Sequence, residues 1–167
     1  MLIERDKLMI DLCGFVSTSS DRIPALQGVA ELLRNFGSYR WVGLYDVDSA
    51  AGTVTNIVWS GPGAPENPKF PVTKGLTGAA ISSRKTLNVG DVAADPRYLT
   101  TFGTTRSEII VPVFDWAGEN VVGTIDVESE MPNAFTEGVQ ALLEACSNMI
   151  RPLWRGRFSA PIRAAKR

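Results

Sequence analysis

The chain has 167 residues, of which 44% are hydrophobic and 21% charged, and its formal net charge is −1. This length favours a single domain with a substantial core, and no run approaches the ~18 consecutive apolar residues that a membrane-spanning helix requires. The sequence contains no histidine. That excludes Ser-His-Asp and Cys-His nucleophiles, HExxH zinc sites and histidine-ligated haem.

Charge is unevenly distributed along the chain. All 18 acidic residues lie within 1–150, and six of the 17 basic residues lie within 151–167. A basic tail can contact nucleic acid or anionic lipid, but this one has no recognition-helix pattern. We therefore interpret 1–150 as one domain, with Trp154 and Phe158 continuing its last helix into a basic tail. Nucleic-acid binding is not expected.

The cysteines and the N-terminal segment bear on the cellular compartment. The opening residues MLIERDKLMIDL are too rich in charge for a signal peptide. With two cysteines and no CxxC pair, we expect a cytoplasmic protein without a disulfide framework or a thiolate zinc site. Cys13 and Cys146 fall on helical apolar stripes, where a free cysteine usually behaves as a small buried hydrophobe.

Two helices are predicted at the start of the chain. The first spans 3–16, with an apolar face that includes Leu8 and Leu12. The second spans 22–36, where Asp21 is one of the N-cap candidates and Gly37 lies just past the end.

The middle of the chain alternates short strands with loops. RWVGLYD at 40–46 and TVTNIVW at 53–59 predict a hairpin. Residues 61–71 hold four prolines and two glycines and predict a loop. The next predicted elements are a short helix over 75–83, a strand over 86–89, and an irregular stretch over 91–106 of the kind that forms lids or walls of sites.

The stretch from 107 to 129, SEIIVPVFDWAGENVVGTIDVES, predicts an antiparallel hairpin. Its alternation places one set of residues toward the core: Ile109, Val111, Val113, Val121, Gly123, Ile125 and Val127. Glu108, Asp126 and Glu128 fall on the opposite face. The three carboxylates form either an ordinary solvated face or the floor of a pocket.

A last amphipathic helix begins near Thr136. The order of elements predicts an α+β fold in which the terminal helices cover one face of an antiparallel sheet. The segments 60–83 and 91–106 would cover the other face, and ligand sites favour such a loop-walled position.

Four motifs in chain order resemble one family. FGSYRWVGLYDVD, FPVTKGLTGAAISSRKTLNVGDVAADPRY, SEIIVPV and VVGTIDVES together resemble a GAF domain and, within that family, the free methionine-R-sulfoxide reductases. The resemblance covers residues 26–150. It implies a six-stranded antiparallel sheet with helices on one face and a small-molecule pocket on the other.

The chain departs from the reductases at their cysteines. Where those enzymes place three cysteines, this chain has Asn67, Thr77 and Thr101. A threonine hydroxyl cannot replace a thiolate, because it ionises far too weakly and forms neither a sulfenic acid nor a disulfide. We therefore expect no catalytic residue, and Thr77 and Thr101 are expected to line a ligand pocket.

The residues that hold a ligand in the family are retained. Trp41 and Tyr45 match its WxGxY strand, Glu108 its SEI motif, and Asp126 and Glu128 the acidic positions of its DID-like strand. The resemblance implies that they bind the ammonium group of a free amino acid and enclose its side chain. Judged from the sequence pattern alone, the two aromatic residues could equally be plain core.

The sequence thus predicts a GAF sensor domain that binds a small amine or amino acid, without catalysis, cofactor or metal, and passes its signal to an unidentified downstream protein. Two alternatives stay open: an enzyme like the free methionine-R-sulfoxide reductases, and a purely structural dimerisation module. We expect a homodimer, because GAF-like domains commonly pair through terminal helices and because Leu2, Leu8 and Trp154 would otherwise lack a cover.

Overall fold

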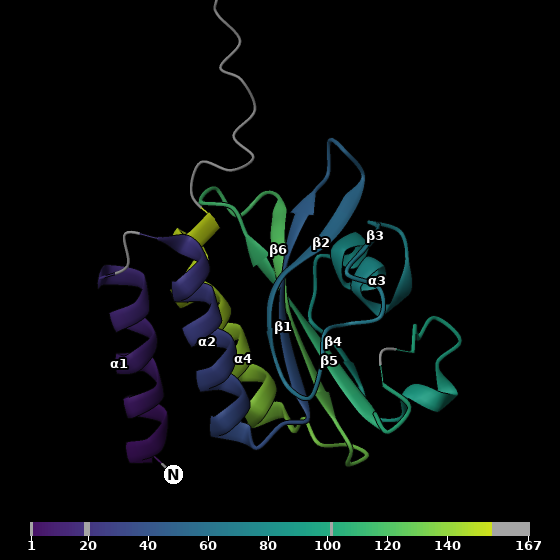
Figure 1. The fold of residues 1–167 in the computed structure, drawn as a ribbon, viewed down its shortest axis with the longest axis horizontal. Helices are drawn as coiled ribbons and strands as arrows, with labels where there is room; N and C mark the ends of the chain where they lie inside the picture. The colour runs from purple at the N-terminus through teal and green to yellow at the C-terminus, as the bar shows by residue number, and fades with distance from the viewer. Residues whose placement is uncertain (1, 19–20, 101, 155–167) are drawn as a thin grey trace, which may run out of the picture.

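An antiparallel sheet of six strands forms the centre of the molecule (Figure 1). The computed structural model describes residues 2–18, 21–100 and 102–154. Within them the strand order is β3-β2-β1-β6-β5-β4, and every pairing is antiparallel. The strands are β1 (Trp41–Asp48), β2 (Thr53–Ser60), β3 (Lys69–Pro71), β4 (Leu87–Val89), β5 (Ser107–Phe114) and β6 (Val121–Ser129).

Helices cover the two faces of the sheet unequally. The first, second and last α-helices lie on one face with α1 outermost, and α3 lies on the other (Figure 1). Their bounds are α1 (Leu2–Thr18), α2 (Arg22–Gly37), α3 (Gly75–Ser83) and α4 (Glu137–Ile150), with 3-10 turns η1 (Val92–Ala94) and η2 (Arg151–Trp154). This is the predicted α+β fold. No helix in the described part of the chain is long and apolar enough to cross a membrane.

Side-chain caps fix where two of the helices begin. The Asp21 carboxylate accepts a hydrogen bond from the Ile23 backbone N–H, and the Thr136 hydroxyl accepts one from Val139 N–H. α2 ends one residue later than predicted, because Ser38, rather than Gly37, takes the left-handed cap conformation with a φ of 51°.

The main core lies between the three helices and the sheet. It joins apolar side chains of all three helices to the inward face of β1, β5 and β6, among them Leu12, Leu26, Leu33, Val42, Leu44, Ile109, Val127, Leu143 and Ile150. Trp154 of η2 is buried in the same core. The packed chain therefore extends to residue 154, beyond the domain end predicted at 150.

Two further apolar clusters lie on the opposite face of the sheet. One groups Trp41, Tyr45 and Val54 with the partly buried Phe70 and Phe102. The other groups four buried residues of α3, η1 and β5 with three partly buried ones: Leu76, Ala80, Val92, Ile110, Leu87, Val89 and Tyr98. The segments 60–83 and 91–106 therefore cover this face, as predicted.

Two strand predictions were wrong. The predicted loop 61–71 ends in β3, an edge strand, where proline is tolerated. In the second hairpin, Val113 pairs with Gly123 but Phe114 pairs with Val121, so one residue of β6 is extra. Such a bulge reverses the side-chain alternation. As a result Val121 packs on the opposite face, beside Tyr45, instead of in the main core.

Two predictions about the terminal helices also need correction. Cys13 is exposed, because the buried positions of α1 fall at Leu8 and Leu12. Leu8 and Trp154 are both buried within one chain, so neither needs a partner subunit to cover it.

Candidate functional site

Strand register brings the three predicted carboxylates together on the face opposite the helices. Glu108 of β5 pairs directly with Glu128 of β6, and Asp126 follows two residues along on the same side of β6. On the other flank, β1 aligns Trp41 with Glu128 and Gly43 with Asp126. All three residues are buried: Glu108 is 7% exposed, Asp126 3% and Glu128 1%. The solvated-face interpretation is therefore wrong, and the carboxylates lie on the floor of a pocket.

A cavity of about 30 Å³ lies above this floor. Its walls come from the loop before β3, from β3, from the first turn of α3 and from the 91–106 segment: Pro65, Asn67, Phe70, Gly75, Leu76, Thr77 and Leu99. Trp41 and Tyr45 close the β1 side. Such a volume holds about two water molecules.

Aromatic rings form the β1 wall. The Trp41 indole N–H donates to the Gly63 carbonyl oxygen at 3.1 Å, which ties the ring to the loop above the sheet. The ring lies over Gly43, where a Cβ would come within 2.1 Å of it. Tyr45 contacts both Trp41, at 6.4 Å between ring centroids, and Phe70, at 5.9 Å. These rings are pocket wall as well as core.

Burial without a counter-charge shapes the electrostatics of the site. No lysine or arginine is among the described residues that line the cavity. Burial, and then the charges of Glu128 and Asp126, raise the pKa of Glu108 well above its usual range. Burial raises the pKa of Asp126 to about 7, although the hydrogen bond from Thr77 lowers it. Burial likewise raises the pKa of the Tyr45 phenol.

Threonine hydroxyls reach two of the three carboxylates. Thr77 Oγ1 donates to Asp126 Oδ2 at 2.8 Å, and Thr105 Oγ1 donates to Glu128 Oε2. The other oxygen of Asp126 is buried and has no hydrogen-bond partner among the described residues. The pocket therefore contains a buried hydrogen-bond acceptor that no described residue satisfies.

Comparison with known proteins assigns the fold to a family. Residues 21–151 match the model of the GAF domain. This chain belongs to the GAF domain family. GAF domain-containing protein A of Dictyostelium discoideum is 29% identical over 132 residues, which cover 79% of this chain and 80% of that protein.

Two other similar proteins are free methionine-R-sulfoxide reductases. The Saccharomyces cerevisiae enzyme is 30% identical over 110 residues, which cover 66% of this GAF domain chain and 60% of the enzyme. The crystal structure of the Neisseria meningitidis enzyme in complex with its substrate matches with a TM-score of 0.82 and 26% identity, covering 90% of this chain and 87% of that one.

The pocket of this GAF domain collects most of the predicted site residues. Trp41, Tyr45, Thr77 and the three carboxylates all line it, as does Asn67. Thr101 lies outside the described residues. Thr105, which the sequence pattern did not single out, precedes β5 and is buried beside Glu128. No sequence signal distinguishes it from the neighbouring Thr104, since only the folded chain brings it to the carboxylate.

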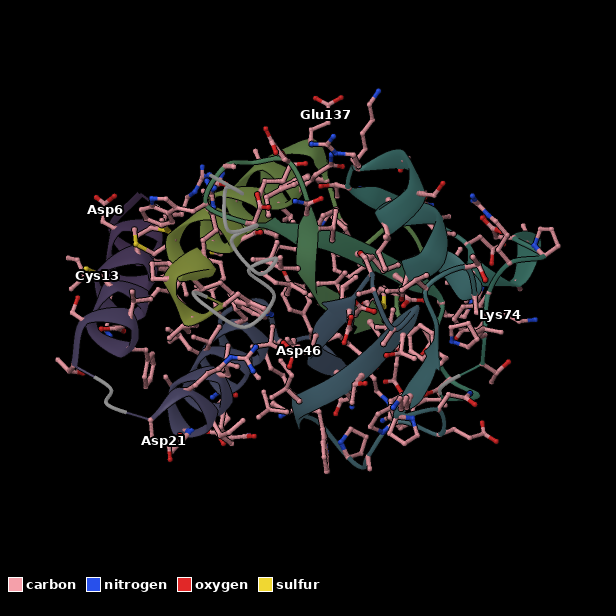
Figure 2. The ribbon with its side chains drawn as sticks, turned by 90° about the horizontal axis from the view of Figure 1, so that it is seen from above. Asp6, Cys13, Asp21, Asp46, Lys74 and Glu137 are labelled. Atoms are coloured by element: carbon pink, nitrogen blue, oxygen red, sulfur yellow. The ribbon has the colours of Figure 1, made fainter. Side chains whose placement is uncertain are left out.

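Neither cysteine of this GAF domain reaches the pocket. Cys146 lies in the main core on the helical side of the sheet, and burial raises the pKa of its thiol to about 12. Cys13 lies on the outer helix α1, across the molecule from Lys74, the residue that precedes α3 (Figure 2). Among the described residues, no group of three or more Cys, Asp or Glu is arranged to hold a metal ion.

Proposed function

We propose that this GAF domain senses a small amine or amino acid, which it binds through a primary ammonium group without catalysing a reaction on it. The observation that carries the proposal is the set of three buried carboxylates facing an aromatic wall, with no lysine or arginine among the described lining residues. A cationic ligand would bring a positive charge to the cavity, which no described lining residue supplies.

Hydrogen bonding supports an ammonium group in particular. Asp126 Oδ1 is a buried acceptor without a partner among the described residues, and Glu108 makes no hydrogen bond with any of them. An ammonium group carries three N–H donors, and charge-assisted hydrogen bonds contribute roughly 1.5–3 kcal/mol each. The nearby Trp41 ring adds a cation–π contact or an apolar wall.

The size of the cavity supports a sensor role. A space of about 30 Å³ is too small for an amino acid, so the walls must move outward when the ligand enters. Those walls include loop segments and the first turn of α3, which packs on the sheet through the cluster that contains Leu76 and Ile110. Ligand occupancy would thus change the position of the α3 layer, and that displacement is the output we propose.

We propose that the domain is not catalytic because the positions of the reductase cysteines are occupied by other residue types. Asn67 and Thr77 stand at two of the three reductase cysteine positions and line the pocket, and Thr101 stands at the third. Both cysteines of the chain lie away from the pocket. A peroxide- or sulfoxide-reducing cycle needs a thiolate that can become a sulfenic acid and then a disulfide.

We predict no thioredoxin- and NADPH-dependent reduction of free methionine-R-sulfoxide above a no-protein control. The loss of NADPH absorbance over time measures this activity. Turnover that survives in the Cys13→Ser, Cys146→Ser double variant would show that catalysis does not need the family cysteines, and the binding-only proposal would fall.

A thermal-shift screen of amino acids and primary amines tests binding. A ligand at 100 times its Kd adds about 2.7 kcal/mol, which raises the Tm of a domain of this size by roughly 5–10 °C. Glu108→Ala and Asp126→Ala should remove the shift and remain folded. Glu119→Ala is the matched control, because Glu119 is exposed in the turn of the same hairpin. Equal shifts in all three variants would place the ligand elsewhere.

A further inference from the structure

The three pocket carboxylates differ in the hydrogen bonds they accept. The Thr77 hydroxyl donates to Asp126 at 2.8 Å, and the Thr105 hydroxyl donates to Glu128. Glu108 receives neither, and it makes no hydrogen bond or ion pair with any described residue. A hydroxyl that donates to a carboxylate stabilises its ionised form.

Among the described residues, no positively charged group lines the cavity beside Glu108. The groups that face it are Glu128 and Asp126 from β6 and the Tyr45 phenol from β1, and the first turn of α3 contributes only Gly75, Leu76 and Thr77 to the cavity. Three carboxylates so deeply buried cannot all stay ionised without a cation. At least one proton must remain in the empty pocket, on the carboxyl group that is least stabilised as an anion.

We propose that Thr77 and Thr105 are positioning residues that hold Asp126 and Glu128 as carboxylates and leave the proton of the empty pocket on Glu108. This inference rests on the proposed function and adds its regulation. An ammonium ligand that enters the pocket makes Glu108 ionise, and the Glu108 proton is released to solvent. Ligand binding is thereby coupled to pH, with tighter binding as pH rises.

The directions in which the pKa values of Asp126 and Glu108 shift agree with this assignment. Burial raises the pKa of Asp126 to about 7, and the hydrogen bond from Thr77 opposes that rise. No comparable hydrogen bond lowers the pKa of Glu108, which is raised first by burial and then by Glu128 and Asp126. Above neutral pH Asp126 is therefore ionised, and burial without a donated hydrogen bond favours the proton on Glu108.

The residue type at position 77 determines whether this site carries redox chemistry or a fixed hydrogen-bond donor. The resemblance to the reductases implies a cysteine at the position that Thr77 occupies here. A hydroxyl is a stronger hydrogen-bond donor than a thiol and does not undergo thiol redox chemistry. The threonine thus replaces a reactive group with a fixed donor that sets the charge of its neighbour.

Infrared spectroscopy of the ligand-free protein at pH 8 tests the assignment, because a protonated carboxyl group has a C=O stretch separate from that of carboxylates. The wild type should show one buried protonated carboxyl. Glu108→Gln should lose this band and Asp126→Asn should keep it. Thr77→Val should gain a second protonated carboxyl, since Asp126 loses its donor, and Thr77→Ser should restore the wild-type spectrum.

Three results would overturn the proposal: no protonated carboxyl in the wild type, a band that survives Glu108→Gln, or a Thr77→Val spectrum like that of the wild type. If Thr77→Val fails to fold, the Glu108→Gln and Asp126→Asn spectra still decide which group holds the proton. The spectra need no ligand. An error in the proton assignment therefore leaves the amine-binding proposal standing, and a failure of amine binding leaves the spectra valid.

Discussion

Glu108 and Glu128 stand directly opposite one another on neighbouring antiparallel strands, a position where like charges normally destabilise a sheet. Both are buried, and Asp126 lies beside them. The sequence pattern could predict this convergence, because strict alternation places the three residues on one face. It could not predict Thr77 and Thr105 as their donors, since both come from the layer above the sheet and only tertiary packing fixes their positions.

The raised pKa of Asp126 has a consequence for stability. Its folded-state value is about 7, whereas an unfolded aspartate titrates near about 4. Between these values the folded protein binds a proton that the unfolded chain has released. The free energy of unfolding therefore falls as pH rises through this window, and the loss is complete above about pH 7. Glu108 acts in the same direction.

We therefore predict that Asp126→Asn is more stable than the wild type at pH 8. Its free energy of unfolding should be larger by on the order of 2–4 kcal/mol, and its Tm correspondingly higher. The difference should disappear near pH 4, and thermal melts across this range measure it. Asp115→Asn is the control. The Asp115 carboxylate accepts hydrogen bonds from Glu119 N–H and Asn120, so its loss should bring no gain. A wild type more stable at pH 8 than at pH 5, with Asp126→Asn less stable, would contradict the burial argument.

At the scale of elements, periodicity predicted the helices and the long strands, because each buries one face against a continuous core. It could not predict the bulge opposite Val113 that turns Val121 to the other face, since the paired strand decides where an extra residue is accommodated. Nor could it predict β3, whose three residues form a strand only because β2 offers a free edge.

The last element, η2, is tied to the rest of the domain by several contacts. The Arg22 guanidinium donates to the Leu153 carbonyl oxygen at 2.6 Å and to Asp46 Oδ2 at 3.1 Å, and it lies 5.2 Å from the centroid of the Trp154 ring. Trp154 packs directly on Gly123, where a Cβ would come within 2.5 Å of the indole. Residues 151–154 therefore belong to the folded domain.

We predict that truncation after Ile150 lowers the Tm by roughly 10 °C, because it removes a buried Trp side chain, worth about 3–5 kcal/mol, from the core. Truncation after Trp154 is the control and should leave the Tm close to that of the full chain. Thermal melts of the two truncated proteins would contradict this if both matched the full chain, or if both lost the same stability.

At the scale of the whole molecule, the sheet separates a layer that forms the main core from a layer that forms the pocket. The helices bury the main core on one face, and the acidic pocket lies on the other. β1 contacts both layers, since Tyr45 lines the pocket while Asp46 binds Arg22 of α2. The family resemblance predicted this division correctly, because the position of a GAF pocket follows from the topology of the sheet.

The homodimer stays a prediction. Burial of Leu8 and Trp154 within one chain removes part of its rationale, and Ile10 of α1 is 70% exposed. We expect light scattering at tens of micromolar, where weak interfaces dissociate, to give twice the chain mass of 18.1 kDa. If α1 forms the interface, Ile10→Glu should shift the protein to a monomer. A wild type that is monomeric at these concentrations would refute the prediction.

The central claim is that the pocket selects a primary ammonium group. Isothermal titration with norvaline, pentylamine, pentanol and valerate tests it most directly, because these compounds share a carbon chain and differ in their head groups. Norvaline or pentylamine should bind the wild type and lose binding in Glu108→Ala, while pentanol and valerate should not bind. Binding of valerate or pentanol in preference to both ammonium compounds would contradict the claim.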